Sequence, residues 1–299
     1  MKTKRLLICS LYSTSFLLLL ASSINAQQLS RTEIEEKLEK EGCVTLTASK
    51  VKICKYDYLA GSKTVEAITI RPLADSKYPA IMMIPGFGGT AKTFITLGTI
   101  FAQQGFACLS VTEPGYGKSE GKPSFMGPDD IKAFAVGFKK FKREPFVDSE
   151  KMGIFGYSRG GMAASLLTIK LGKEVKAAVC GAGIYDFKRA YDETGFDGIR
   201  ENMRAETGMT EKAIRERSSI LQMEKLKTPI LIIHGENDKN APTDQALLLR
   251  DRLTALKKDF EIKILPNHKH GQLRGDFISP VIDFFSRKLK GVPSNLNFS

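Results

Sequence analysis

The stretch that decides the fold is MGIFGYSRGGMAASLL, residues 152–167. An apolar run ends at Gly156 and an Ala- and Leu-rich segment begins at Arg159, so the stretch predicts a strand, a very tight turn and a helix. Its centre, GYSRG, is a G-x-S-x-G pattern. Such a turn lifts the serine hydroxyl above the sheet, and only small residues such as Gly156 and Gly160 let the backbone fold that closely. We therefore expect Ser158 to be a nucleophile at the N-terminus of a helix, where developing negative charge is favoured.

A serine nucleophile needs a general base, and the chain contains three histidines. His234 ends a strand-like apolar run and is expected to have a structural role. His268 and His270 lie in ILPNHKHGQL, just after the last expected strand. A loop at that place would overhang the same edge of the sheet as Ser158, so we expect His270 to be the base, with His268 as the alternative.

The base needs an acid that orients it. Asp238 lies in HGENDKNAP, shortly after an apolar strand, and the order Ser158, Asp238, His270 matches the order serine, acid, histidine of one enzyme fold. The acid would hold the tautomer of the imidazole and stabilise its charged form. Glu236 is the nearest alternative, and a purely structural Asp238 would cap a turn.

Two glycine-rich loops follow other expected strands. PGFGG, residues 85–89, comes after the apolar run YPAIMMI, and we expect the backbone N–H groups of Phe87 and Arg159 to form an oxyanion hole. The G-x-x-x-x-G-K-[ST] pattern of nucleotide-binding loops is missing from the sequence. The second loop, TEPGYGKSEGKPS, should border the site, with Glu113 and Tyr116 either touching substrate or belonging to a plain structural loop.

The remaining pattern predicts the architecture. A charged helix is expected at 31–41, and strand patterns fill 43–84. Strands at 106–111, 151–156, 175–181, 229–234 and 260–265 then alternate with helices near 90–104, 129–143, 160–171, 243–257 and 276–290. This alternation predicts an α/β fold whose mostly parallel sheet has helices on both faces and an antiparallel edge. Residues 184–226 interrupt the alternation with a polar, helix-prone excursion, which we place over the carboxyl edge of the sheet, where ligands bind in such folds.

The first 26 residues have the order of a secretory signal peptide: a basic start, an apolar stretch and small residues ending at Ala26. We expect cleavage after Ala26, a single domain over 27–290, a loose tail over 291–299 and a secreted or periplasmic protein without stable membrane insertion. The alternative is an uncleaved membrane anchor, for which the apolar stretch is short. Cleavage lowers the net charge from +12 to +9 over 273 residues, because the segment holds three of the 45 basic residues and none of the 33 acidic ones.

Export permits disulfides. Cys43 and Cys54 flank a short strand-rich segment, and spacing alone leaves open whether they pair. Cys108 and Cys180 end apolar runs and are expected to be buried thiols.

The chain from about 64 to 290 resembles an α/β-hydrolase, specifically the catalytic domain of the prolyl-oligopeptidase family and its esterase relatives. The resemblance is carried by VDSEKMGIFGYSRGGM around Ser158, KLKTPILIIHGENDKNAP around Asp238, and HG at 270–271. It implies an eight-stranded, mostly parallel sheet, a Ser158–Asp238–His270 triad, a covalent acyl-enzyme intermediate and no cofactor or metal.

The sequence departs from the peptidases of that family in two ways. Fewer than forty residues lie between the expected cleavage point and the first strong strand pattern, so we expect no propeller domain there. No motif matches the glutamates with which the dipeptidyl members grip a peptide amino terminus. We therefore expect hydrolysis of carboxyl esters or of small peptide or acyl-amino amides, with a dipeptidyl or acylaminoacyl peptidase as the alternative.

The sequence was also weighed against a non-catalytic binding protein and a polyanion binder. A non-catalytic binding protein on the same fold is disfavoured because every triad position is filled. The net charge suggests a polyanion binder, for which the basic runs 139–143 and 287–290 are the candidates. Both runs lie on expected helices beside apolar faces, which is typical of solvated helix surface, so we expect no nucleic-acid partner.

Overall fold

The computed structural model describes residues 29–294. The predicted signal peptide lies outside the described residues, as does most of the predicted tail. No helix within residues 29–294 combines the length and the hydropathy that a membrane span requires.

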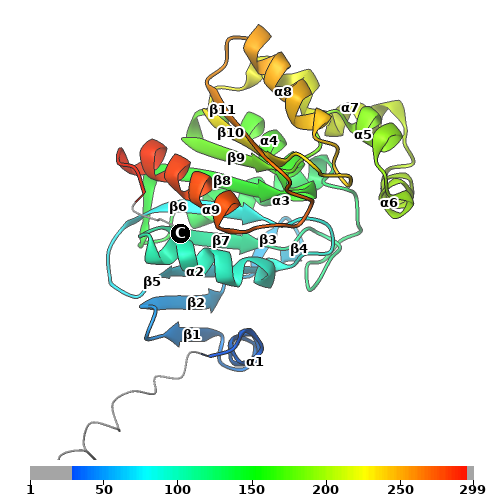
Figure 1. Ribbon diagram of the computed structural model, residues 1–299. Helices are drawn as coiled ribbons and strands as arrows, with labels where there is room; N and C mark the ends of the chain where they lie inside the picture. The colour runs from blue at the N-terminus through cyan, green and yellow to red at the C-terminus, as the bar shows by residue number, and fades with distance from the viewer. Residues whose placement is uncertain (1–28, 295–299) are drawn as a thin grey trace, which may run out of the picture.

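A nine-stranded sheet runs through the molecule in the order β1-β2-β5-β7-β6-β8-β9-β10-β11 (Figure 1). The strands are β1 (Cys43–Leu46), β2 (Val51–Lys55), β5 (Ala67–Pro72), β6 (Tyr78–Ile84), β7 (Ala107–Val111), β8 (Val147–Tyr157), β9 (Ala177–Gly181), β10 (Ile230–Gly235) and β11 (Phe260–Leu265). The six strands from β7 to β11 in this order pair in parallel, and the first three pair antiparallel. The predicted mostly parallel sheet with an antiparallel edge is confirmed.

The number of strands differs from the eight that the resemblance implied. The additional strand is β1, which forms an antiparallel hairpin with β2 at the edge of the sheet. Its residue Val44 is buried together with Val51 and Ile53 of β2, so the added strand extends the apolar face. A disulfide joins Cys43 to Cys54 across the same hairpin. A separate small hairpin consists of β3 (Tyr58–Ala60) and β4 (Lys63–Val65).

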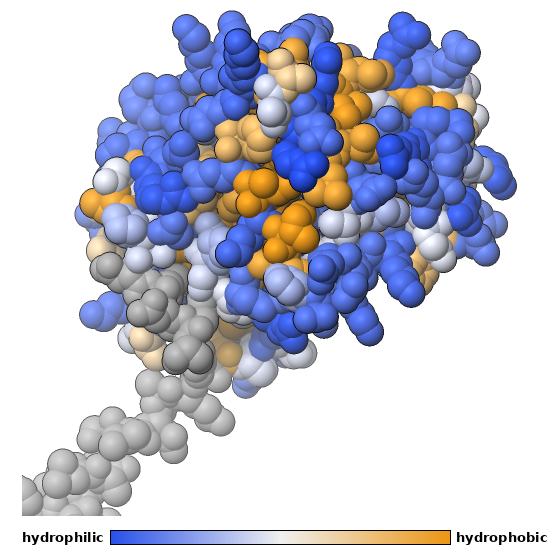
Figure 2. All heavy atoms as spheres, turned by 45° about the horizontal axis from the view of Figure 1, so that its top comes forward, coloured by the Kyte–Doolittle hydropathy of each residue, from blue (hydrophilic) through white to orange (hydrophobic). Residues whose placement is uncertain are grey.

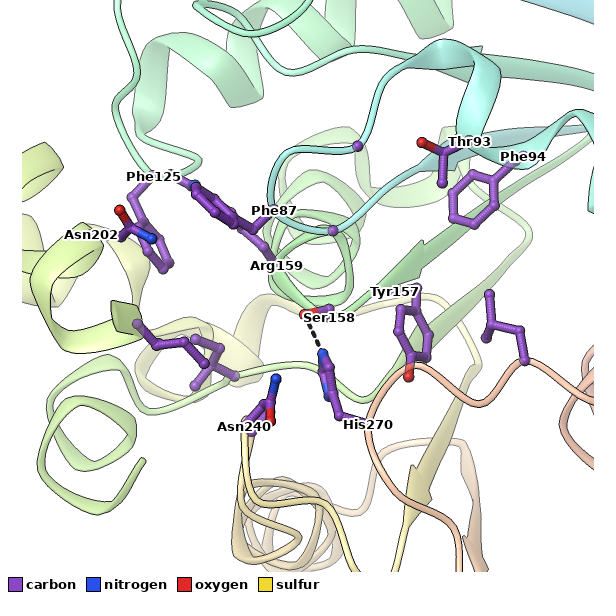
Figure 3. Close-up of a pocket in the computed structure, with 16 residues that line it drawn as sticks. Phe87, Thr93, Phe94, Phe125, Tyr157, Ser158, Arg159, Asn202, Asn240 and His270 are labelled. Carbon is purple, nitrogen blue, oxygen red and sulfur yellow. Dashed lines mark hydrogen bonds between the residues drawn. The ribbon is translucent and has the colours of Figure 1, made fainter. Parts of the chain in front are cut away.

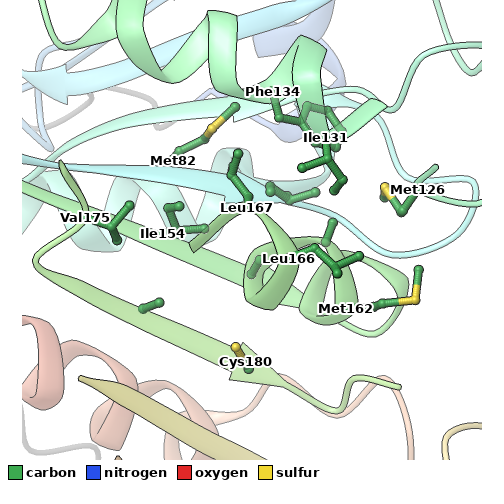
Figure 4. Packing of buried hydrophobic residues seen from close by; sticks show 14 of the residues in the cluster. Met82, Met126, Ile131, Phe134, Ile154, Met162, Leu166, Leu167, Val175 and Cys180 are labelled. Atoms are coloured by element: carbon green, nitrogen blue, oxygen red, sulfur yellow. The ribbon is translucent and has the colours of Figure 1, made fainter. Parts of the chain in front are cut away.

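Helices cover both faces of the sheet, as predicted (Figure 1). One face packs against α1 (Arg31–Glu41), α2 (Ile95–Gln103) and α9 (Gly275–Phe285), and the other against α3 (Pro128–Phe141), α4 (Arg159–Leu171) and α8 (Asp244–Ala255). Figure 4 shows the second face, where Met82 and Ile154 of the sheet meet Phe134 of α3 and Leu167 of α4. This packing fixes α4, and therefore the turn at its start, against the middle of the sheet.

The predicted excursion, residues 184–226, is helical and is called the cap segment below. It contains α5 (Phe187–Glu193), α6 (Asp197–Thr207), α7 (Glu211–Arg217) and a 3₁₀ turn over 219–225. The guanidinium of Arg217 donates hydrogen bonds to the carbonyl oxygens of Ser124 and Phe125, which joins α7 to the loop after β7. The cap segment is thereby attached to a loop at the carboxyl edge of the sheet.

Figure 2 shows one face of the molecule coloured by hydropathy. On the face that Figure 2 turns toward the viewer, hydrophobic side chains gather in a band that crosses a field of hydrophilic ones.

Candidate active site

Ser158 lies at the turn between β8 and α4, where the sequence pattern placed it. Its backbone has φ 58° and ψ −125°, a conformation that non-glycine residues rarely adopt. Such strain persists only where the surrounding structure enforces it, and it is concentrated at functional sites. The turn therefore has the geometry that the G-x-S-x-G pattern predicts for an exposed nucleophile.

The two glycines of the pattern are required by packing. A Cβ atom on Gly156 would lie 2.0 Å from the carbonyl oxygen of Gly160, and one on Gly160 would lie 2.0 Å from the carbonyl oxygen of Ile84. Both obstacles are backbone atoms, which cannot move aside as a flexible side chain can. The backbones of β6, β8 and α4 meet here too closely for any side chain.

A continuous chain of hydrogen bonds joins Ser158, His270 and Asp238. His270 Nε2 lies 2.9 Å from Ser158 Oγ (Figure 3). His270 Nδ1 donates to Asp238 Oδ2 at 2.6 Å. The other oxygen of Asp238 accepts the backbone N–H groups of Asn240 and Ala241 at 2.9 and 3.0 Å. With Nδ1 carrying the proton, Nε2 is left free to accept the serine proton.

The alternatives to His270 and Asp238 have other partners. His268 is buried and its Nε2 pairs with Asp276 at the start of α9. His234 is fully buried, which lowers the pKa of its imidazole, and its Nε2 donates to the carbonyl oxygen of Ala241 at 2.8 Å. Glu236 accepts the backbone N–H of Asn267 at 3.0 Å. None of these three contacts reaches Ser158.

Tyr157, the residue before the nucleophile, supports the base. Its phenolic oxygen accepts the backbone N–H of Gly271 at 2.6 Å, and its ring lies 5.5 Å from the ring of His270, centroid to centroid. Burial raises the pKa of Tyr157 to about 12, so the phenol stays protonated at neutral pH. One residue of the tight turn thus contacts the loop that carries the base.

The backbone N–H groups predicted for the oxyanion hole flank Ser158. Arg159 begins α4, and Phe87 lies in the loop after β6, beside Gly86, whose added Cβ would lie 3.0 Å from Ser158 Cβ. Among the hydrogen bonds of residues 29–294, neither N–H has an acceptor. Two unpaired donors next to a nucleophile are the arrangement that binds a developing oxyanion.

A pocket of about 400 Å³ opens beside Ser158. Its walls come from six regions: the segment between β6 and α2, the loop after β7, the turn before α4, the cap segment, the loop that carries the acid and the loop that carries the base (Figure 3). The lining residues are Gly86, Phe87, Gly89, Thr93, Phe94, Phe125, Tyr157, Ser158, Arg159, Ile184, Ile199, Asn202, Asn240, Ala241, His270 and Leu273. No carboxylate is among them. Most of the lining side chains are apolar, and the polar ones include Arg159 and the uncharged amides of Asn202 and Asn240.

A buried polar group, called the Arg159 cluster below, lies behind one wall of the pocket. It consists of Arg159, Glu113, Tyr116 and Glu206. The Arg159 side chain pairs with Glu206 of the cap segment, lies 3.3 Å from Glu113 and donates to the Tyr116 hydroxyl at 3.0 Å. Its guanidinium carbon also lies 3.8 Å from the centroid of the Phe125 ring.

The cluster decides the role of the second glycine-rich loop. Glu113 and Tyr116 were expected either to touch substrate or to belong to a plain structural loop. Neither residue lines the pocket, which favours the structural loop. Burial raises the pKa of Glu113 to about 7, against the opposing charge of Arg159.

The sequence pattern therefore found the residues that meet at Ser158 and missed those that surround them. Tyr157, Asn202, Asn240 and Glu206 were not predicted. Glu206 lies 47 positions from Arg159 and shares no local motif with it. Tyr157 does stand inside the G-x-S-x-G pattern, and Asn240 two positions after the predicted acid, so for these two residues a local signal was available.

Comparison with known proteins gives the family. A family model described as the prolyl oligopeptidase family matches residues 101–292. The chain belongs to the prolyl oligopeptidase family. It is accordingly a serine-type peptidase by family, and the resemblance seen in the sequence is confirmed.

Among relatives of this prolyl oligopeptidase family member, an uncharacterized peptidase of Bacillus subtilis, YtmA, is 30% identical over 217 residues, which cover 71% of this chain and 83% of YtmA. Dipeptidyl-peptidase 5 of Porphyromonas gingivalis is 25% identical over 216 residues, 67% of this chain but 31% of that enzyme. The solved structure of the acylaminoacyl peptidase of Pyrococcus horikoshii matches with a TM-score of 0.72 at 22% identity, covering 83% of this chain and 43% of the other. The chain thus spans less than half the length of the last two proteins, and the structural match shows the α/β-hydrolase fold.

Proposed function

We propose that this chain is an exported serine peptidase that cleaves small peptides or acyl amides through Ser158, His270 and Asp238. The observation that carries the proposal is the hydrogen-bonded series from Asp238 through His270 to Ser158 at the mouth of an apolar pocket. Membership of a peptidase family favours the amide bond over the carboxyl ester, which was the first expectation from the sequence.

The reaction follows from the geometry. Ser158 Oγ attacks the substrate carbonyl carbon while His270 Nε2 takes its proton. The N–H groups of Phe87 and Arg159 hold the oxyanion of the tetrahedral intermediate. His270 then gives the proton to the leaving amine, which departs and leaves an acyl group on Ser158. A water molecule, deprotonated by His270, attacks the acyl carbon, and the acid product leaves with Ser158 restored.

The pocket also bears on the choice between peptidase types. A free α-ammonium group is best held by a carboxylate, and the lining contains none. Glu113 and Glu206, which lie behind one wall of the pocket, are paired with Arg159, and Asp238 is bonded to His270. This favours an acyl part without a free amino group, as in a blocked peptide, over the substrates of a dipeptidyl peptidase.

The test compares the wild-type protein with Ser158→Ala. Substrates are p-nitrophenyl acetate and butyrate, and matched p-nitroanilides of amino acids with a free and an acetylated amino group. We expect turnover of the acetylated anilide to exceed that of the free one, and all turnover and fluorophosphonate labelling to be lost in Ser158→Ala. Undiminished turnover in the variant would refute the mechanism. A preference for free amino groups would overturn the substrate assignment.

The proposed export rests on the order of charged, apolar and small residues in the first 26 positions and is supported by the Cys43–Cys54 disulfide. Expression of the full chain in a bacterium should yield periplasmic or secreted protein whose first residue is Gln27. Recovery of an uncut chain from the cytoplasm would contradict this part of the proposal.

A further inference from the structure

Helix α6 of the cap segment forms one wall of the pocket. Ile199 and Asn202 line the pocket, and Glu206 follows Asn202 by one turn. Because residues three, four and seven apart lie on one face of a helix, the three side chains share the face of α6 that is turned to the body of the molecule. The position of that wall therefore depends on what holds this face of α6.

Glu206 makes the polar contacts that hold it. One carboxylate oxygen accepts the Tyr116 hydroxyl at 2.5 Å, and the other accepts the backbone N–H of Phe125 at 2.7 Å and pairs with the Arg159 guanidinium. The Glu206 side chain is 9% exposed and that of Arg159 is 2% exposed. A carboxylate that accepts three hydrogen bonds and is shielded from solvent is held more firmly than the carboxylate of an exposed ion pair.

Other polar side chains of α6 do not make this connection. Arg200 bonds to the carbonyl oxygens of Tyr191 and Thr194, and Arg204 to the Tyr191 hydroxyl, all within the cap segment itself. In the part of the chain that the structure describes, Glu206 is the side chain of α6 with hydrogen bonds to the body of the molecule. Its partners come from the loop after β7 and from the first turn of α4, both of which border the pocket.

We propose that Glu206 is a positioning residue that determines specificity: it fixes α6 to Arg159, Tyr116 and Phe125, so that Ile199 and Asn202 form a set wall against the acyl part of the substrate. This inference rests on the proposed function, because it names what limits the acyl group that the same site accepts. A substrate with a short acyl group does not reach the wall, whereas one with a long or bulky acyl group packs against it.

The kinetic test uses Glu206→Gln and Glu206→Ala, with Glu201→Gln as the matched control. Glu201 is an exposed glutamate of the same helix for which the structure gives no ion pair. The substrates are p-nitrophenyl acetate, butyrate and octanoate. Loss of a buried hydrogen bond to a charged group corresponds to about tenfold in an equilibrium constant, so we expect KM for the octanoate to rise about tenfold in Glu206→Ala. KM for the acetate and kcat for both esters should change less than about threefold, since Ser158, His270 and Asp238 are untouched.

A second measurement does not depend on catalysis. Hydrogen exchange of the α6 amides should be about tenfold faster in both Glu206 variants and unchanged in Glu201→Gln, while exchange in β8 and α4 stays as in the wild type. This arm also separates a released α6 from a protein that has lost its fold.

The outcomes are distinguishable. Equal losses on acetate and octanoate, or α6 exchange as slow as in the wild type, would overturn the role of Glu206. A wild-type protein that turns over none of the esters and escapes the fluorophosphonate would overturn the proposed function, and with it the assignment of specificity. Faster α6 exchange in that case would support the attachment of the helix alone.

Discussion

At the scale of single residues, the two neighbours of the nucleophile, Tyr157 and Arg159, connect its turn to the rest of the site. Tyr157 precedes Ser158 and contacts the loop of the base, whereas Arg159 follows it and contacts the cap segment. The two side chains leave the tight turn toward opposite walls of the pocket (Figure 3). The two variable positions of the G-x-S-x-G pattern therefore connect the nucleophile's turn to two different parts of the site.

Replacing Tyr157 with Phe should weaken the positioning of His270. The substitution removes the oxygen that accepts the Gly271 N–H and leaves a backbone donor without its partner, a loss of about 1–3 kcal/mol. We expect kcat to fall about tenfold with KM nearly unchanged. Tyr78→Phe, which removes an exposed hydrogen bond to the carbonyl oxygen of Ala74, is the control. Equal kcat in both variants would argue against this role of Tyr157.

Glu113 should make the stability of the protein depend on pH. Burial raises the pKa of its carboxyl group from 4.5 to about 7 in the folded protein. A raised folded-state pKa contributes stability that is present below the unfolded pKa and is lost as pH rises through the folded one. In urea unfolding between pH 4.5 and 7, the stability of the wild type relative to Glu113→Gln should thus decrease as pH rises. A difference that is constant or increases would contradict the assignment.

At the scale of secondary-structure elements, the sheet edge and the strand-to-helix turn were predictable to different degrees. Helix α1 was predicted from its charged sequence at the bounds that the structure has. The structure adds the reason for those bounds: Ser30 and Glu33 form a capping box, and Gly42 ends the helix. The strand patterns over 43–84 were expected to form an antiparallel edge of the sheet, and β1 and β2 lie at that edge. Their register against β5 could not be predicted, because it joins residues that no local pattern connects. The cap segment was recognised as helical by composition, but its attachment through Glu206 depends on contacts distant in sequence.

The turn between β8 and α4 should not accept a side chain at position 160. Gly160→Ala would place a Cβ 2.0 Å from the carbonyl oxygen of Ile84, so we expect a loss of more than about 3 kcal/mol in the free energy of unfolding, or no folded protein. Gly198→Ala in α6 is the control, because its Cβ would meet nothing within 4 Å. Chemical denaturation of both variants gives the measurement, and a Gly160→Ala protein as stable as the control would refute the close packing.

The edge hairpin should depend on its disulfide. Cys43 and Cys54 are 11 positions apart, and cross-links that close loops of this size contribute about 2–3 kcal/mol by restricting the unfolded chain. Cys54→Ser with Cys43→Ser should therefore lower Tm by about 5–10 °C. Calorimetry without reductant gives the comparison. Wild-type protein treated with reductant should show the same lowering, and a Tm that reductant leaves unchanged would contradict the prediction.

At the scale of the whole molecule, the net charge of +12 suggests a polyanion binder, but four basic side chains of the two basic runs are paired with carboxylates. In the first run, Lys139 and Lys142 lie 3.7 and 3.8 Å from the carboxylate of Glu174. In the second run, Arg287 pairs with both Glu261 and Asp283, and Lys288 lies 3.3 Å from Asp259.

The pairing has a consequence for binding. A phosphate backbone attracts a protein by neutralisation with free cations, and each cation already paired with a carboxylate must first lose that partner. We therefore expect the protein to leave a DNA or heparin column at or below about 0.15 M NaCl, despite its basic composition. Glu261→Gln with Asp283→Asn frees Arg287 from both partners and should shift elution to higher salt. The contrary result is a wild type that stays on the column at about 0.15 M NaCl and a double variant that elutes at the same salt concentration. The ion pairs of the basic runs would then not control retention, and a polyanion-binding surface would lie elsewhere on the molecule.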